Sequence, residues 1–200
     1  MLTGIKTMES RSRAFKNSLL AVVDGQLDKM DLTSYDVIIF PMFEHHHFYL
    51  VCFDMNCPAI EVIDNMHKEN CWVSLKDNPK FLSKGTPCKV RHIFSAYLKE
   101  VKHPKALSIP HVAPRRRVID WGTRENFTDC GIFAMRHMEA YFGSSKPLNC
   151  GFNNKESEQQ EQIKNLRMKY AAKILLSDAN LLKRKVIEDA RKVADKKKVA

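Results

Sequence analysis

The residues best suited to chemistry are Asp129-Cys130-Gly131, which stand at the opening of a predicted helix. In the first turn of a helix, free backbone N–H groups and the helix dipole favour negative charge, so a cysteine there favours the nucleophilic thiolate. The same N–H groups face any oxyanion that forms on an attacked carbonyl. Gly131 leaves room for a substrate to approach. Taken alone, these residues favour a buried cysteine that starts a core helix.

A nucleophilic cysteine requires a base, and the base requires an orienting group. His47 opens one predicted strand and Asp64 ends the next, so neighbouring strands would bring an imidazole and a carboxylate together. Asp64 would bind one ring nitrogen of His47, and the other nitrogen would take the proton of Cys130. Alternatively, His47 is a surface histidine at a strand edge and Asp64 is a turn former.

A run of three histidines raises the question of a metal site. His45 and His47 would point the same way on a strand, and Cys52 and Cys57 follow closely. The second ligand pair of a four-ligand zinc site is missing, however. We therefore expect no metal and no cofactor.

The elements that must position these residues follow from the hydrophobic pattern. Apolar residues at helical spacing predict helices over 10–30, 89–102, the segment after Cys130 up to Gly143, 155–176 and 179–194. Runs of β-branched and aromatic residues predict strands in YDVIIFPMF (ended by Pro41) and at 47–53, 59–64 and 115–121, with loop over 66–87. The first three strands have short connections and should be adjacent. Segregated strands and helices predict an α+β fold rather than alternating βαβ units.

Composition excludes several classes of protein. The 200 residues are 44% hydrophobic and 28% charged, as in globular proteins. No apolar run approaches the length of a membrane helix or a secretory signal. The six cysteines have irregular spacing without C-x-x-C, which favours a reducing compartment over a disulfide framework.

Charge points toward acidic partners. Thirty-three Lys and Arg against 23 Asp and Glu give a net charge of +10, and residues 183–198 hold eight basic and three acidic residues. Such a run attracts nucleic acid or acidic protein surfaces and is typical of nuclear import signals, although it also fits a solvated helix face. Arg115, Arg116 and Arg117 form a second basic run, but no nucleic-acid-binding motif accompanies either.

Three motifs together resemble a known family. HHHFYLVCF, EVIDNM and NFTDCGIFAMRHMEAYF, in this order, look like the catalytic domain of the ubiquitin-like-protein-specific proteases, the SUMO-deconjugating cysteine peptidases. The similarity is greatest to the plant, transposon-associated branch and covers roughly residues 35–176. It implies a papain-like fold, with a small mixed sheet flanked by helices and a C-terminal helical arm. It also implies a protease-like domain over 1–176 and a basic helix over 177–200.

Carried over residue by residue, the resemblance makes Cys130 the nucleophile, His47 the base and Asp64 the orienter. It implies cleavage after the terminal glycine of a ubiquitin-like modifier such as SUMO, in a precursor or at an isopeptide bond, and a nuclear or otherwise cytoplasmic protein. Asn126 matches the asparagine in the family's turn before the cysteine.

The chain also departs from the family. Arg124 replaces the usual glutamine that donates to the oxyanion, and a guanidinium differs from an amide in length and shape. Phe48 replaces the tryptophan that shapes the channel for the modifier's tail, and it fits a core strand as well. The family's N-terminal element is not recognisable in residues 1–35. Arg124 and the unrecognised N-terminal element favour an alternative, an inactive relative that binds a modifier or another partner.

Overall fold

The computed structural model describes residues 7–23, 25–26, 31–66, 79–123, 126 and 128–198. The chain divides into two compact units, Met1–Gly151 and Phe152–Ala200. Among the described helices, none is both long enough and apolar enough to cross a membrane. The first unit holds a small sheet and the residues of the candidate site.

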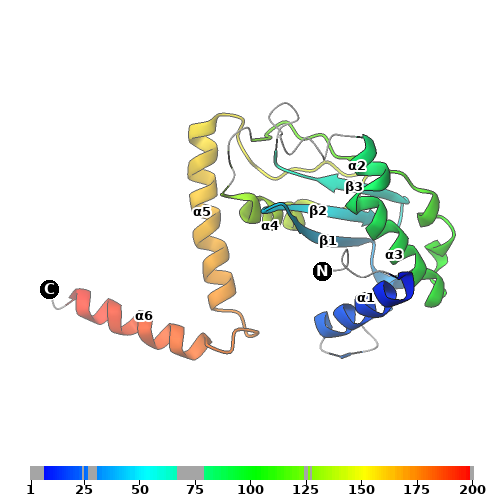
Figure 1. The fold of residues 1–200 in the computed structure, drawn as a ribbon. Coiled ribbons are helices and arrows are strands. Elements are labelled where there is room, and N and C mark those ends of the chain that lie inside the picture. The colour runs from blue at the N-terminus through cyan, green and yellow to red at the C-terminus, as the bar shows by residue number, and fades with distance from the viewer. Residues whose placement is uncertain are drawn as a thin grey trace. The chain divides into compact units, whose positions relative to one another are not determined.

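The sheet has four strands, ordered β1-β2-β3-β4 (Figure 1). These strands are β1 Val37–Glu44, β2 His47–Asp54, β3 Ala59–Ile63 and β4 Pro114–Arg116. The first three pair antiparallel in chain order, and β4 pairs parallel to β3. The prediction of an α+β fold with a small mixed sheet is therefore confirmed, as is the adjacency of the first three strands.

Strand β1 differs from its prediction because it continues through Pro41 to Glu44. Pro41 pairs in register with Leu50 of β2. Proline lacks an N–H group and breaks central strands, but β1 is an edge strand, where a missing donor is tolerated. The β1–β2 turn places His45 and His46 at φ 51° and 59°. That left-handed geometry is the one a tight two-residue hairpin requires.

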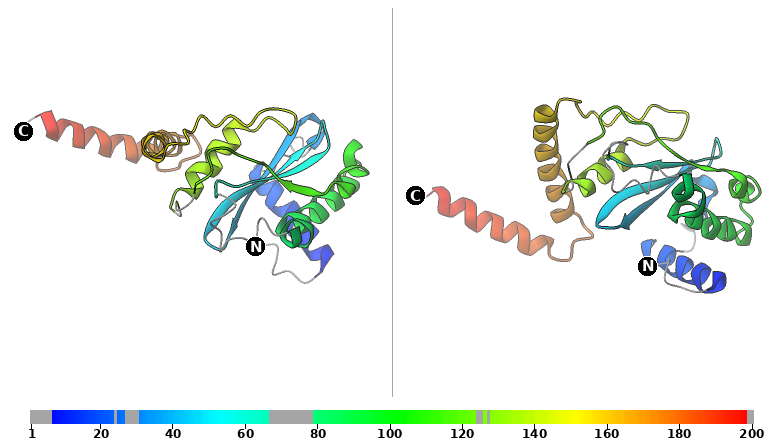
Figure 2. Two further views of the ribbon diagram at one scale, coloured as in Figure 1. Left: turned by 90° about the horizontal axis from the view of Figure 1, so that it is seen from above. Right: turned by 45° about the horizontal axis from the view of Figure 1, so that its top comes forward.

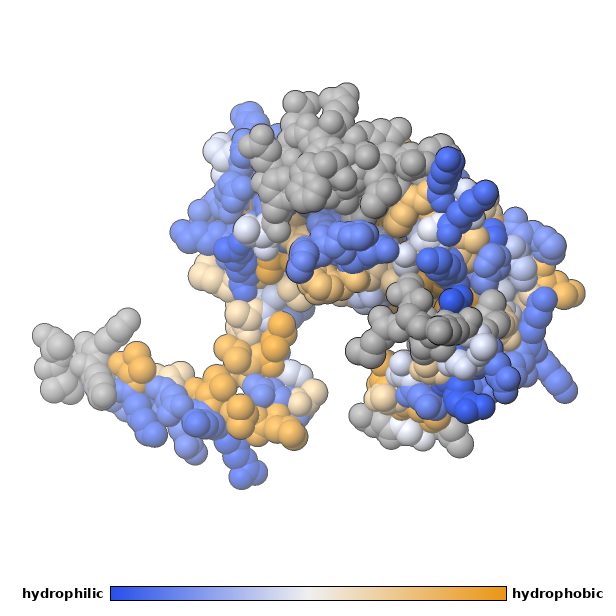
Figure 3. Space-filling view, in the orientation of Figure 1, coloured by the Kyte–Doolittle hydropathy of each residue, from blue (hydrophilic) through white to orange (hydrophobic). Residues whose placement is uncertain are grey.

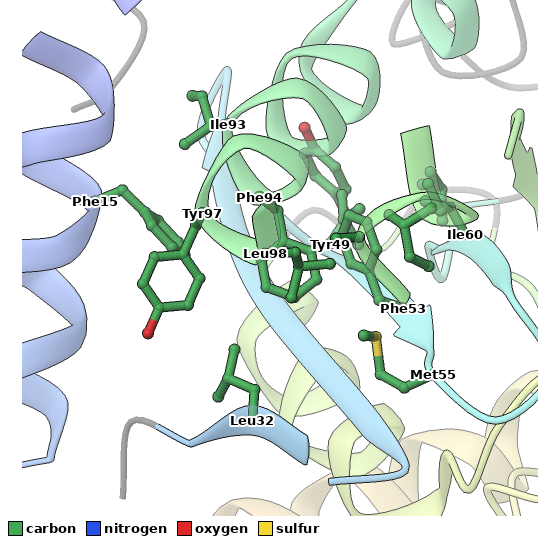
Figure 4. Close-up of a cluster of buried hydrophobic side chains, with 14 residues drawn as sticks. Phe15, Leu32, Tyr49, Phe53, Met55, Ile60, Ile93, Phe94, Tyr97 and Leu98 are labelled. Carbon is green, nitrogen blue, oxygen red and sulfur yellow. The ribbon is translucent and has the colours of Figure 1, made fainter. Parts of the chain in front are cut away.

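Strand β2 is buried on both faces, as its unbroken apolar sequence predicts. One face packs against α1 Met8–Val22 and α3 Thr86–Glu100, and α4 Cys130–Ala140 packs on the other face (Figures 1 and 2). Figure 4 shows the larger cluster, on the α3 side. Its fully buried members include Tyr49, Val51, Phe53, Ile60, Val62, Phe94, Leu98 and Ile109.

Two segments of the first unit correct the prediction. The loop expected over 66–87 contains a short helix, α2 Pro79–Lys84, and α3 begins at Thr86 rather than at residue 89. Pro79 and Pro87 lie in the first turns of these two helices, where proline is well accommodated. The strand expected over 115–121 is shorter: only Pro114–Arg116 pairs with β3.

The second unit is helical. It consists of α5 Glu156–Leu175 and α6 Lys183–Lys198, and α6 starts four residues later than predicted because residues 177–182 form turns. The domain boundary predicted at 176/177 falls between these two helices, inside the second unit. The division into a protease-like domain and a basic helix stays a prediction. Exposed apolar residues gather where α5 gives way to α6 (Figure 3). They are Ile174, Leu175, Leu176, Leu181 and Leu182.

Candidate functional site

A buried imidazole–carboxylate pair lies at one end of the sheet. His47, the first residue of β2, has its Nε2 at 2.8 Å from Oδ1 of Asp64, the residue directly after β3. Both side chains are buried. Asp64 Oδ1 also accepts the backbone N–H of Met66, at 3.1 Å, which holds the carboxylate in place. The structure therefore brings His47 and Asp64 together as predicted, and it leaves Nδ1 as the second ring nitrogen for proton exchange.

Cys130 is the first residue of α4, so its thiol stands at a helix N-terminus. The helix is held on the sheet by Ala134, which packs with Leu50, Cys52 and Ile63. Cys130 itself is 7% exposed. Helix α4 packs on β2, the strand that carries His47, on the face opposite α3.

The thiol-bearing helix and the histidine-bearing strand meet next to the candidate site. A Cβ added to Gly131 would lie 3.8 Å from Cδ2 of Phe48. Because Gly131 follows Cys130 and Phe48 follows His47, this approach places the two predicted site segments side by side. The Cys130 thiol and the His47 ring, both within the described residues, are not hydrogen-bonded to each other. Catalytic hydrogen bonds are often long in free enzymes and shorten when substrate binds.

Asn126 organises the turn before the helix. Its Oδ1 accepts the backbone N–H groups of Thr128 and Asp129, at 3.2 and 2.9 Å. Its Nδ2 donates to Asp129 Oδ2 at 2.7 Å. Asp129 is the N-cap residue, but its side chain makes no capping bond. Asn126 thus shapes the turn that precedes Cys130, as its match to the family's turn asparagine predicts. Arg124 lies outside the described residues.

The sequence analysis does not single out His137. This histidine is buried in α4, close enough to the His47–Asp64 pair for their charges to affect it. It is 1% exposed, two turns along α4 from Cys130, with its ring 5.1 Å from that of Trp121. Burial lowers the pKa of His137 to about 3, an effect that the Asp64 charge opposes and His47 reinforces. Neither ring nitrogen has a hydrogen-bond partner in the described part of the chain. The charge pattern of the sequence does not reveal this buried histidine. Its position seven residues after Cys130 does indicate that both residues lie on the same face of α4.

The arginine run at 115–117 serves the fold. Arg115 and Arg117 both bind the buried carboxylate of Glu61, at 3.0 and 3.1 Å, and Tyr141 donates to the same carboxylate at 3.0 Å. Arg117 also donates to the carbonyl oxygens of residues 144 and 146. Arg116 donates to the Met66 carbonyl. All three arginines thus have partners within the protein, so the run needs no nucleic-acid ligand to explain it.

The histidine run contains one buried member. His45 and His46 lie in the exposed β1–β2 turn, whereas His47 turns inward to Asp64. No group of three or more His, Cys, Asp or Glu residues is placed to hold a metal ion, within the residues that the structure describes.

Comparison with solved structures gives a distant likeness. No family model and no curated protein matches this chain. A solved structure described as the de-sumoylating protease resembles it, with 15% identity and a TM-score of 0.44. The match covers 79% of this chain and 66% of that one, so the chain spans less than two thirds of the other protein. A likeness at this level assigns no activity, substrate or residue role.

Proposed function

We propose that this protein is a cysteine-type peptidase that cleaves after the C-terminal glycine of a ubiquitin-like modifier such as SUMO. The observation that carries the proposal is the buried His47–Asp64 pair, which lies on the strand facing the helix that begins with Cys130. A thiol at a helix N-terminus, a base and a carboxylate that orients the base are the parts that thiol proteolysis requires.

The proposed reaction proceeds in two halves. The Cys130 thiolate attacks the glycine carbonyl, and the His47 imidazolium gives its proton to the departing amine as the C–N bond breaks. A thioester remains on Cys130. His47 then takes a proton from water, the hydroxide attacks the thioester carbonyl, and the C–S bond breaks. The products are the Cys130 thiolate beside the His47 imidazolium and the glycine carboxylic acid, which loses its proton to solvent. Backbone N–H groups at the start of α4 face the oxyanion in both halves.

The contact between Phe48 and Gly131 supports a glycine-terminated substrate. Phe48 is 38% exposed, so its ring lies partly at the surface beside the first turn of α4. Gly131 presents no side chain toward the Phe48 ring, so we propose that the side-chain-free glycine end of a modifier lies beside this pair. We therefore assign Phe48 and Gly131 to the channel for the modifier's tail. The assignment of Arg124 and Asn126 to the oxyanion rests on the family resemblance alone.

A second candidate is a module that binds a modifier without cleaving it. The small exposure of the Cys130 side chain and the missing thiol–imidazole hydrogen bond favour this alternative. Nuclear localisation and assignment to the plant, transposon-associated branch stay predictions from the sequence.

Covalent probes separate the two candidates. SUMO and ubiquitin with a C-terminal vinyl sulfone are each incubated with the purified protein, and the adduct is followed by gel shift. We expect labelling by the SUMO probe, its loss in Cys130→Ala and in His47→Ala, and its retention in Cys57→Ala, which removes an exposed cysteine elsewhere. No labelling by either probe, or equal labelling of Cys130→Ala, would refute the peptidase; unlabelled protein that binds SUMO would indicate the binding module.

A further inference from the structure

Two buried side chains tie the end of β3 to the segment that leads toward Cys130. Asn65 Nδ2 donates to Thr123 Oγ1 at 2.8 Å, and the Thr123 backbone N–H donates to the Asn65 carbonyl at 2.6 Å. The Thr123 hydroxyl also lies 3.3 Å from that carbonyl, to which it donates. Met66 and Thr123 form an isolated parallel bridge. We call the Asn65–Thr123 pair the clamp; both residues are buried.

One side of the clamp is part of the Asp64 turn. Asn65 follows Asp64 directly, and Met66 donates its N–H to the Asp64 carboxylate oxygen that binds His47. The clamp holds Asn65 by its side chain and its backbone, so it restricts the peptide that carries the carboxylate. A shift of Asn65 would therefore move the acceptor of the His47 hydrogen bond.

The other side of the clamp reaches α4. Trp121, two residues before Thr123, stacks on Phe133 of α4 with ring centroids 6.0 Å apart and an interplanar angle of 7°. Its ring also contacts that of His137. Phe133 lies one turn after Cys130, and its N–H bonds the Asp129 carbonyl. Residues 121–123 thus bridge the carboxylate-bearing strand end and the thiol-bearing helix.

We infer that Asn65 and Thr123 are positioning residues, which set the register between Asp64 and Cys130 through the clamp and the Trp121 stack. They act on the reaction through His47 and Asp64 and do not touch substrate. This inference rests on the proposed function, because it concerns the same three residues. Small displacements of catalytic groups are costly: about 1 Å can lower a rate by roughly 100-fold.

The test removes the clamp hydroxyl without changing shape. Thr123→Val keeps the backbone bond to Asn65 and loses the side-chain bond, and Thr123→Ser restores the hydroxyl. Ser144→Ala is the matched control, because the Ser144 hydroxyl bonds Asp54 at 2.8 Å, at the opposite end of β2 from His47. Asn65→Ala provides a second way to break the clamp, and thermal melting checks that each variant is folded.

The primary readout does not depend on a modifier. Alkylation of Cys130 by iodoacetamide is measured by peptide mass spectrometry between pH 5.5 and 9. An imidazole base that is correctly oriented toward the thiol assists removal of the thiol proton. We expect Thr123→Val and Asn65→Ala to lower the rate at pH 6 by about tenfold, and Thr123→Ser and Ser144→Ala to stay within about twofold of the wild type. With SUMO-linked substrate, kcat should fall by a similar factor while KM stays within about twofold.

Each outcome decides one question. An unchanged alkylation profile in Thr123→Val overturns the clamp, whether or not the protein cleaves SUMO. An equal loss in Ser144→Ala also overturns it, because the effect is then general loosening of the fold. If the wild type cleaves no modifier, the proposed function fails, and the alkylation profiles of the variants still decide the clamp.

Discussion

Acidification should destabilise this protein through His137. Its folded pKa of about 3 lies well below the value of about 6.5 for an exposed histidine. As pH falls below 6.5, the unfolded chain binds a proton at this site and the folded chain does not, so stability falls with pH until about 3. The slope approaches about 1.4 kcal/mol per pH unit, which gives a loss of about 2 kcal/mol between pH 7 and pH 5.

Urea unfolding at pH 7 and pH 5, followed by tryptophan fluorescence, measures this contribution. His137→Leu replaces the imidazole with an apolar side chain of similar size and so removes the titrating group. Its unfolding free energy should therefore change by about 2 kcal/mol less between the two pH values than that of the wild type. His111→Leu, at an exposed position, is the control and should follow the wild type. Equal pH dependence in the wild type and His137→Leu would refute the reasoning.

Three further substitutions test other contacts. Gly143→Ala forces a Cβ to 2.9 Å from Asp54 Oδ2 at φ +112°, so the unfolding free energy measured in urea should fall by about 1–3 kcal/mol. Glu61→Gln removes the carboxylate shared by two arginines and should cost about 2–4 kcal/mol in the same assay; a change below 0.5 kcal/mol would contradict the shared ion pair. Gly131→Ala meets Phe48 at an ordinary 3.8 Å, so its melting temperature should be unchanged while labelling by the SUMO probe slows by about tenfold or more. Full labelling would refute the channel role.

The sequence best predicts those helices and strands whose own apolar residues show which faces are buried. Strand β2 is recognisable because its apolar run is buried on both faces, and α4 because apolar residues follow Cys130 at helical spacing. The strand end predicted at Pro41 is wrong, because proline ends a strand only where its missing N–H is needed, and edge position is a property of the whole sheet. The late start of α6 likewise depends on turns that periodicity does not register.

The candidate site was predictable as far as residue types and strand ends determine it. The pairing of His47 with Asp64 follows from two adjacent strands whose lengths are visible in the sequence. The clamp was not predictable, because Thr123 and Asn65 are 58 residues apart and have no chemistry that marks them. The arginine run was misleading for the opposite reason: the charges of Arg115 and Arg117 face Glu61, whose burial only the fold reveals.

The two borders of the small sheet bear on how molecules of this protein behave toward one another. The unpaired backbone N–H and C=O groups of an edge strand can pair with a strand of another molecule, which leads to aggregation. In this sheet, the edge strand β1 contains Pro41, which has no amide hydrogen to donate. The other edge strand, β4, is only three residues long. Each offers a poor template for an incoming chain, which should let concentrated solutions of the protein resist fibril-like self-assembly.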